Sequence, residues 1–545
     1  MSEDRHSAEP DAGVERCPKI CGADMELGNF ILGMERANGT GYEASRALLR
    51  EVRGVSGREY GQDAAGGGWE SRYGTCSAAP GSYSQDWGRK FLAGNGGCIY
   101  IDLNHLELCL PEVTGARDWL ACWHAMLRIA RRAAVEVNEK LGGGRSVQVL
   151  ANNSDGLGNA YGSHMNFLIP RRTWDGMFNR KLHQLLFLAA YQASSIVFAG
   201  QGKVGFENGT EPAAYQLSQR ADFFEHLTGV QTTSHRPIVN SRDEPLCGPH
   251  GSADGALARL HCIFYDSNMC HAANYLKTGV MQIVLSMIEA EVTYPNLALD
   301  DAVEAVVKWS HDPGLTATAR TASGDPVTAV ELQMRFCEMA ARFVESGGCD
   351  GLVPEASSIL DLWGDTLAKL KANDMDSLMP RLDWVLKLSL IERAMDEYSR
   401  LDWDSPETRR LDLAYSNLDP FEGLYWACEN AGLVERLVTD EEIESFTENP
   451  PEDTRAYTRA MLLRTAGPGV VDRVDWDSVR FRMRTSGWWP EYRTLNMPSP
   501  IRFTKRETGG LFEGAPPLDE ILDALGATDP DGAPERRVTY VRTRG

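Results

Sequence analysis

The chain has few basic residues for its length. Lysine and arginine together number 55, against 77 aspartates and glutamates, so the 545-residue chain has a net charge of −22. A protein that binds nucleic acid neutralises phosphates with a basic surface, so this balance argues against nucleic acid as a partner. The acidic residues are spread along the chain rather than gathered into one run, which is typical of a solvated surface.

Cysteines and long apolar runs are scarce as well. Twelve cysteines with no CxxC pair are too few for a disulfide scaffold. The first 16 residues are polar and lack the apolar core of a secretory signal, and no run reaches about 18 clean apolar residues. The most apolar stretch, residues 182–200, carries polar side chains at a spacing that favours a buried helix over a membrane span. We therefore expect a cytoplasmic protein that does not interact with a membrane.

Several common catalytic motifs are missing. The sequence has no GxxxxGK[ST] phosphate-binding loop, no HExxH zinc motif and no GxSxG nucleophile elbow. Residues 156–162, GLGNAYG, miss the dinucleotide-binding spacing by one residue. The nearest approach to a cluster of metal ligands is His261, Cys262, Cys270 and His271. Neighbouring residues in a strand face opposite ways, so these four cannot all converge on one ion, and we interpret the cysteines as structural thiols.

The order of the expected elements indicates an α+β fold. Strand-like runs mix with helices in the N-terminal half, and the chain is then mostly helical to about residue 430. We expect a flexible tail over residues 1–16, a large domain over 17–430, a small C-terminal domain over 431–505 and a disordered tail over 506–545. Within the large domain, residues 54–97 are rich in Gly and Ser without a sustained period, which is typical of a flexible loop or lid.

Acidic residues stand at alternate positions of two expected strands. Asp24 and Glu26 are two residues apart, and so are Tyr100 and Asp102, while Glu107 follows after a short turn. Residues two apart in a strand point to the same face. Carboxylates that share a face repel one another unless a cation binds between them, and such hard oxygen ligands favour Mg²⁺ held jointly with nucleotide phosphates. A solvated strand face would show the same spacing, so spacing alone leaves both interpretations open.

Ten short segments between about residues 18 and 500 carry a specific likeness to a known family. In chain order they are ICGADMELG, NGGCIYIDLNHLELCLPE, NNSDGLGNAYGSHMNFL, QLSQRADFFE, RPIVNSRDEP, RLHCIFYDSNM, LDWVLK, RRLDLAYSNL, VTDEEI and NPPEDTRAY. With these segments the chain resembles the Pup ligase/depupylase family, relatives of glutamine synthetase and other carboxylate–amine ligases. The resemblance implies a glutamine-synthetase-like catalytic domain, in which a curved antiparallel sheet packed with helices cradles ATP, and a small C-terminal domain.

The resemblance also implies a catalytic and a nucleotide-binding residue. Asp102 matches the catalytic aspartate of the family's Tyr-x-Asp motif. In a ligase this aspartate would deprotonate the substrate lysine, and in a depupylase it would attack the amide or isopeptide carbon or activate water for that attack. Trp476, in the segment VDWDS, falls where a tryptophan of the family contacts the nucleotide.

A magnesium site follows from the same resemblance. Tyr100 and Glu107 match magnesium-binding positions of the family, and Asp24 falls where the family has a magnesium-binding glutamate. Glu26 lies on the same strand face as Asp24. We therefore expect Asp24, Glu26, Tyr100 and Glu107 to hold Mg²⁺ beside ATP.

Four residues depart from the family's pattern. Asp24 replaces a glutamate and shortens its reach by one methylene, Cys98 stands in place of an arginine that meets ATP, and Leu110 replaces a small or hydroxyl-bearing residue. Met165 replaces the glutamate of a His-Glu-Asn triplet. Losing an arginine and a carboxylate near the phosphates would remove charge-assisted contacts of about 1.5–3 kcal/mol each. We therefore expect altered nucleotide binding or a specialised activity.

The resemblance favours the depupylase branch of the family. The long loop at 54–97 and the segments QRADFFE and PPEDTRAY are more similar to that branch than to the ligases. We expect an ATP- and Mg²⁺-dependent amidohydrolase that acts on Pup or on Pup-conjugated proteins, with a possible link to a bacterial proteasome. Two alternatives stay open: an ATP-dependent Pup–protein ligase that forms an isopeptide bond to lysine, and a diverged nucleotide-binding homologue with weak or no catalysis.

Overall fold

An open antiparallel sheet forms the centre of the molecule. The computed structural model describes residues 16–34, 39–56, 87–244, 246–247, 256–467, 469–483 and 491–528. Its seven-stranded sheet has the order β11-β6-β1-β4-β3-β2, and β5 pairs with the far end of β1. The strands are β1 (Cys21–Leu32), β2 (Trp87–Phe91), β3 (Cys98–Asp102), β4 (His105–Cys109), β5 (Ser146–Leu150), β6 (Ser163–Pro170) and β11 (Leu257–Cys262). This confirms the α+β class with an antiparallel sheet.

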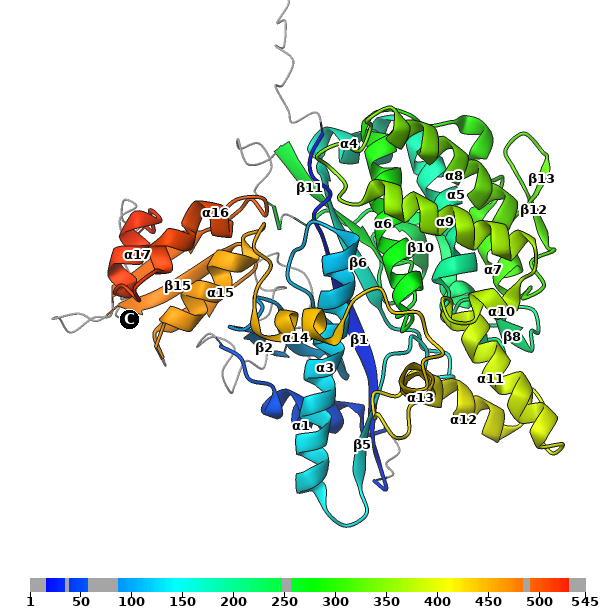
Figure 1. Cartoon of the computed structure of the whole chain (residues 1–545), viewed down its shortest axis with the longest axis horizontal. Coiled ribbons are helices and arrows are strands. Elements are labelled where there is room, and N and C mark those ends of the chain that lie inside the picture. The colour runs from blue at the N-terminus through cyan, green and yellow to red at the C-terminus, as the bar shows by residue number, and fades with distance from the viewer. Residues whose placement is uncertain are drawn as a thin grey trace, which may run out of the picture.

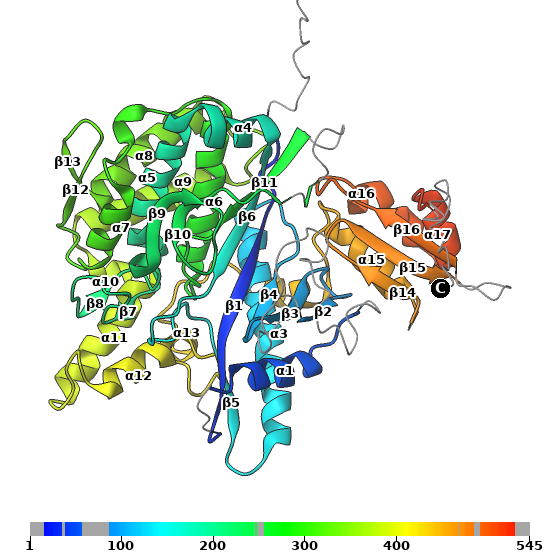
Figure 2. The ribbon, with the colours of Figure 1, turned by 180° about the vertical axis from the view of Figure 1, so that it is seen from behind.

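Strand β1 is the longest strand and joins the two halves of the sheet. Figure 2 shows it running from the helical part of the molecule down to β5. Its alternate residues Met25 and Leu27 are fully buried in the main core, whereas Asp24 and Glu26 are partly exposed on the opposite face. This alternation follows from the two-residue period of a strand and gives the sheet one apolar and one polar face.

Helices cover the apolar face. Helix α1 (Gly41–Glu51) and helix α3 (Ala116–Leu141) pack there, and Trp119 and Trp123 of α3 are fully buried. Beyond the β6–β11 edge lies a helical bundle, seen in green in Figure 1. Its helices are α5 (Leu182–Ala199), α6 (His271–Glu289), α7 (Ala302–Ser310), α8 (Ala329–Glu345) and α9 (Ala356–Lys371).

Shorter elements complete the large part of the structure. The strands are the pairs β7 (Lys203–Val204) with β8 (Tyr215–Gln216), β9 (Phe224–Gly229) with β10 (Arg236–Asn240), and β12 (Thr318–Arg320) with β13 (Pro326–Thr328). The helices are α4 (Arg171–Asp175), α10 (Met375–Leu378), α11 (Asp383–Glu397), α12 (Pro406–Tyr415), α13 (Leu424–Asn430) and α14 (Asp440–Glu448). Helix α5 is the one helix among the described residues that is long and apolar enough to cross a membrane, and 83% of that stretch is buried inside the fold. The prediction of a buried helix there is confirmed.

A small C-terminal unit lies on the other side of the sheet, in orange and red in Figure 1. It consists of α15 (Ala456–Thr465), the three-stranded sheet β14 (Val471–Val474), β15 (Ser478–Met483) and β16 (Glu491–Asn496), and helices α16 (Lys505–Thr508) and α17 (Leu518–Ala524). We expected the small domain to begin at residue 431. Helix α14 instead packs on α3, with ion pairs Arg117–Glu442 and Arg128–Asp440 at 2.8 and 2.7 Å.

Two segments expected to be irregular contain regular structure. Within residues 54–97, β2 pairs with β3, and Val55 forms a bridge to Phe91. Within residues 506–545, Ile521 and Leu522 of α17 are buried in the core of the small unit. Both segments are rich in glycine and charged residues, a composition that predicts irregular structure. Short elements that are stabilised by packing against other segments cannot be predicted from such a composition. The remaining parts of the expected loop and of both tails, residues 57–86, 1–15 and 529–545, lie outside the described residues.

Candidate active site

A cavity of about 850 Å³ lies over the polar face of the sheet. All six side chains that the sequence singled out line it: Asp24, Glu26, Tyr100, Asp102, Glu107 and Trp476. The first five come from three adjacent strands, and the sixth comes from the small C-terminal unit. The sheet and the small unit therefore form two walls of one cavity.

The register of the sheet gathers three carboxylates at the centre of the cavity. Glu26 of β1 lies directly opposite Glu107 of β4, which in turn lies opposite Tyr100 of β3. Carboxylate oxygens of Glu26, Asp102 and Glu107 lie within 4.8 Å of one another. The backbone N–H of Gly162 donates a 3.0 Å hydrogen bond to Glu26. Three converging carboxylates, one of them almost fully buried, fit a hard divalent cation such as Mg²⁺.

A second cluster that could hold a metal ion lies beside the first. Asp24, His164 and His261 each offer a ligand atom within 4.8 Å of the other two. His164 of β6 lies directly opposite Asp24 in the sheet. The side chain of His261 is 5% exposed, and neither ring nitrogen has a hydrogen-bond partner among the described residues.

Both histidines of this cluster are held neutral. Burial chiefly, and then the positive charges of nearby arginines, lower the pKa of His164 and of His261 well below the ordinary range. A neutral imidazole is the form that ligates metals. Sequence reasoning missed this cluster because it tested His261 only against its neighbours in sequence, whereas its partners come from other strands.

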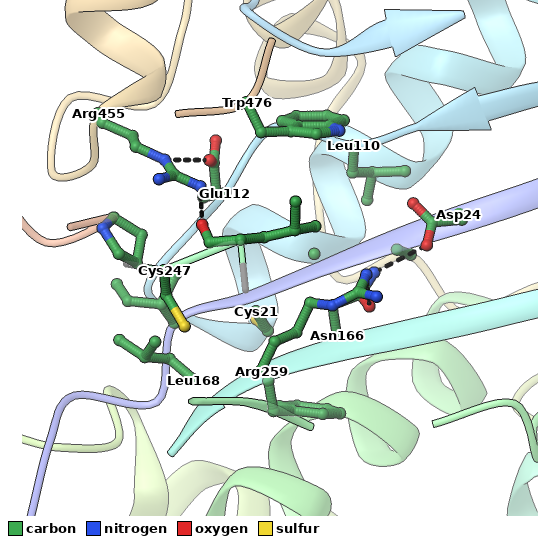
Figure 3. Close-up of a pocket in the computed structure, with 16 residues that line it drawn as sticks. Cys21, Asp24, Leu110, Glu112, Asn166, Leu168, Cys247, Arg259, Arg455 and Trp476 are labelled. Carbon is green, nitrogen blue, oxygen red and sulfur yellow. Dashed lines mark hydrogen bonds and ion pairs between the residues drawn. The ribbon is translucent and has the colours of Figure 1, made fainter. Parts of the chain in front are cut away.

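A chain of polar contacts holds Asp24 in place. The amide of Asn166 donates a 2.9 Å hydrogen bond to Asp24, and the guanidinium of Arg259 donates a 3.0 Å bond to the amide oxygen of Asn166. Figure 3 shows these side chains on the sheet side of the adjoining pocket. Burial lowers the pKa of Arg259 to about 10, so the guanidinium stays charged at neutral pH and adds positive charge beside the carboxylates.

A strained turn places Asp102 at the rim of the sheet. Asp102 ends β3 and pairs with His105 across a two-residue turn, in which Leu103 has a φ of 52°. This left-handed conformation is uncommon outside glycine and needs support from its surroundings. The support comes from Asn29, whose amide donates to the carbonyl of Asn104 at 3.2 Å and accepts from the N–H of Leu106 at 3.0 Å.

Trp476 is fixed by a buried ion pair at the junction of the two units. The guanidinium carbon of Arg459 lies 4.8 Å from the Trp476 ring centre, and the guanidinium donates a 2.9 Å hydrogen bond to the Trp476 carbonyl. Arg459 also pairs with Glu112 at 2.5 Å, and Arg455 does so at 2.8 Å. Burial disfavours ionisation of Glu112, but Arg459 and Arg455 outweigh it and lower its pKa to about 2.

A small apolar pocket lies between Trp476 and the sheet. Cys21, Leu110, Leu168 and Cys247 are among the residues that line it (Figure 3). The pocket volume is about 90 Å³, and it adjoins the larger cavity, because Asp24, Leu246, Arg259 and Trp476 line both. An apolar slot closed by an indole suits a flat aromatic group next to a charged site.

The structure revises one of the four departures from the family pattern. Met165 is fully buried in the main core, on the sheet face opposite the cavity, because its neighbours His164 and Asn166 face the other way. The expected loss of a carboxylate near the phosphates is therefore wrong for this position. Cys98 is fully buried in the core of the small unit with Phe91, and Leu110 lines the apolar pocket. Cys98 is not among the described residues that line the cavity or the pocket, so an effect of the missing arginine on nucleotide binding stays a prediction.

The fold and the site together define an α+β protein with a cluster of carboxylates on the open face of an antiparallel sheet, inside a large cavity. The family model described as Pup-ligase protein matches residues 19–480. The Pup deamidase/depupylase of Mycolicibacterium smegmatis is 35% identical over 433 residues, which are 79% of this chain and 82% of the relative. The Pup–protein ligase of Acidimicrobium ferrooxidans is 36% identical over 398 residues, 72% of this chain and 84% of the relative.

A solved structure of a Pup ligase has a fold similar to that of this chain. The structure of the Pup ligase PafA in complex with ADP has a TM-score of 0.68 and 27% identity, and the match covers 82% of this chain and 91% of that one. The chain therefore belongs to the Pup ligase/depupylase family.

Proposed function

We propose that the protein is an ATP- and Mg²⁺-dependent amidohydrolase that cleaves a side-chain amide or isopeptide bond of Pup. The observation that carries this proposal is the position of Asp102, whose carboxylate lies within 4.8 Å of those of Glu26 and Glu107 inside the cavity. The relative from M. smegmatis, named a Pup deamidase/depupylase, supports both the reaction and the substrate.

Asp102 would act as nucleophile or general base. As a nucleophile, its carboxylate oxygen bonds to the carbonyl carbon of the side-chain amide and the C–N bond breaks, so that ammonia or the lysine amine leaves with a proton taken from a water molecule. Water then cleaves the resulting acyl–aspartate and restores the carboxylate. As a base, Asp102 instead takes the proton of the attacking water. Asp102 lines the cavity at the end of β3, so a substrate carbonyl held in the cavity would lie beside its carboxylate.

The neighbouring residues would bind the cofactors. Glu26 and Glu107, with Asp24 and Tyr100, are the proposed holders of Mg²⁺, and Trp476 is the proposed contact of the adenine ring. Bound Mg²⁺ with the nucleotide would polarise the substrate carbonyl and stabilise negative charge on its oxygen. The apolar slot beside Trp476 supports a planar base there, and the ADP complex of the related ligase supports a nucleotide.

Ligase activity is the second candidate. The relative named a Pup–protein ligase, at 36% identity, is as similar to this chain as the depupylases are. In that reaction Asp102 would take a proton from the substrate lysine. The same carboxylate would then act in forming an isopeptide bond rather than in cleaving one. A catalytically weakened nucleotide-binding protein is the third candidate, favoured by the uncharged Cys98 at the position of an ATP-contacting arginine.

One experiment separates the three candidates. The purified protein is incubated with ATP and Mg²⁺ and either Pup that ends in glutamine or Pup that ends in glutamate, the latter with and without a lysine acceptor, and products are followed by mass spectrometry. Conversion of the glutamine to glutamate supports the amidohydrolase, and ADP release that requires the acceptor supports the ligase. Nucleotide binding without turnover supports the third candidate. We also propose a cytoplasmic location, from the polar N-terminal sequence, and a link to a bacterial proteasome, from the resemblance to the depupylases.

A further inference from the structure

A cluster of two histidines and a glutamate lies outside the carboxylate centre, which consists of Glu26, Asp102 and Glu107. Ligand atoms of Glu225, His226 and His235 lie within 4.8 Å of one another, and all three residues are exposed. Nδ1 of His235 is 2.7 Å from the Glu225 carboxylate, and the rings of His226 and His235 are 5.9 Å apart. The family segments quoted from the sequence assign no role to these residues.

An irregularity in the small parallel pair β9–β10 brings the three side chains together. Arg236 pairs with Phe224 but the next residue, Pro237, pairs with His226, so that Glu225 is an extra residue in β9. Adjacent residues of a regular strand point to opposite faces, whereas a bulge re-aims a side chain. The bulge therefore lets both Glu225 and His226 approach His235.

The backbone at His235 is also unusual. Its φ is 49°, in the left-handed region that non-glycine residues rarely adopt. The conformation is held by the next residue, Arg236, whose Nε donates a 2.8 Å hydrogen bond to the carbonyl of Thr232 and whose guanidinium also reaches the carbonyl of Ala160. This strain directs the His235 ring toward Glu225, and strain of this kind is concentrated at ligand sites.

We propose that Glu225, His226 and His235 bind a divalent transition-metal ion of the zinc class, with water or a partner group as the fourth ligand. Two imidazoles and one carboxylate are a common ligand set for zinc with an open position. Metal–nitrogen distances of about 2.0–2.1 Å require donor atoms about 3.4 Å apart, so movements of little more than about 1 Å close the site. The all-carboxylate centre around Glu107 favours Mg²⁺ instead, so the two sites select different ions.

The ion would act on the rim of the cavity. Thr232 and Thr233 line the cavity and belong to the short segment that ends at His235. A metal ion that joins β9 to His235 would fix both ends of this segment and reduce its movement. The site therefore offers a way for zinc to alter substrate access without touching Asp102.

The test uses tag-free protein with Mg²⁺ in excess, titrated with Zn²⁺ against a chromogenic chelator. The titration should show one Zn²⁺ ion that binds more tightly than any other. We expect His226→Asn and His235→Asn each to raise the Kd of this ion by at least about tenfold, because loss of even a residue that only orients a ligand lowers metal affinity about 10–100-fold. His183→Asn, at an exposed histidine of α5, is the matched control and should bind like the native chain.

A footprint locates the ion independently. One equivalent of Zn²⁺ should protect His226 and His235, but not His183, from diethyl pyrocarbonate, with modification read by peptide mass spectrometry. Equal Zn²⁺ affinity in all variants, or protection of His164 and His261 alone, would overturn the proposal and leave Glu225–His235 as an ordinary surface contact. Thermal unfolding in a chelator should be the same for every variant, because all three substitutions are at the surface.

Discussion

Replacing Arg459 with Met should weaken both the fold and the nucleotide site. Arg459 is fully buried and donates hydrogen bonds to Glu112, to the carbonyl of Gly96 and to the carbonyl of Trp476. Met keeps most of the volume and removes every one of these donors. Removing one partner from a buried ion pair lowers the free energy of unfolding by about 3–5 kcal/mol. Because Arg455 still pairs with Glu112 in the variant, we expect a decrease near the lower figure.

The nucleotide effect comes through Trp476. Without the guanidinium against its ring and carbonyl, the indole loses its fixed orientation. A loss of about 1.4 kcal/mol in binding raises the Kd about tenfold, and this is the change we expect for ATP. Thermal unfolding and titration with a fluorescent ATP analogue measure the two effects separately.

The matched control is Arg506→Met, at an exposed arginine of α16 in the same small unit. It should keep the native unfolding temperature and the native ATP affinity. If Arg459→Met unfolds like the native chain, the ion pair does not join the two units as argued. If it is destabilised but binds ATP with native affinity, Trp476 does not depend on Arg459.

Four further outcomes are expected. The pKa of Glu112 is lowered from 4.5 to about 2. The ionised carboxylate therefore stabilises the fold fully above about pH 4.5, and this stabilisation is lost as the pH falls toward 2. In Glu112→Gln the unfolding temperature should decline less between about pH 5 and 3 than it does in the native chain. Asp102→Asn should abolish turnover of Pup while ATP still binds, and intact turnover would refute the proposed mechanism. Asn29→Ala should lower kcat more than it raises KM, because it loosens the turn beside Asp102; an unchanged kcat would show that the turn is rigid without it. Met165→Glu, which restores the family residue, should destabilise the protein by several kcal/mol, since it buries an unpaired carboxylate, and a thermal melt at native temperature would contradict the placement of Met165 in the core.

The residues of the carboxylate centre could be predicted because they share strands. The alternation of Asp24 with Glu26 and of Tyr100 with Asp102 places each pair on one face, and this local rule holds in the structure. The rule does not say which strands are neighbours. That information came from the resemblance, and the register then places Glu107 between Glu26 and Tyr100.

Other features depend on contacts between distant segments. The sequence neighbours of His261 cannot share an ion with it, but Asp24 and His164 lie close to it from two other strands. The same alternation puts Met165, between His164 and Asn166, on the apolar face, so the family residue at this position gives no carboxylate to the cavity. The ion pair of Glu112 with Arg459 links residues 347 apart, a separation at which no local pattern carries information.

The two faces of the sheet carry different kinds of side chain: candidate site residues lie on one face and core residues on the other. At the centre of β1 Asp24 and Glu26 face the cavity while Met25 and Leu27 fill the core, and on β3 Tyr100 and Asp102 face the cavity while Ile99 and Ile101 fill the core. A mutant library confined to codons 24, 26, 100 and 102 would therefore test the proposed catalytic and metal-binding side chains, whereas one confined to codons 25, 27, 99 and 101 would test the core. A single-codon deletion in the same strands would exchange the two faces and lose both.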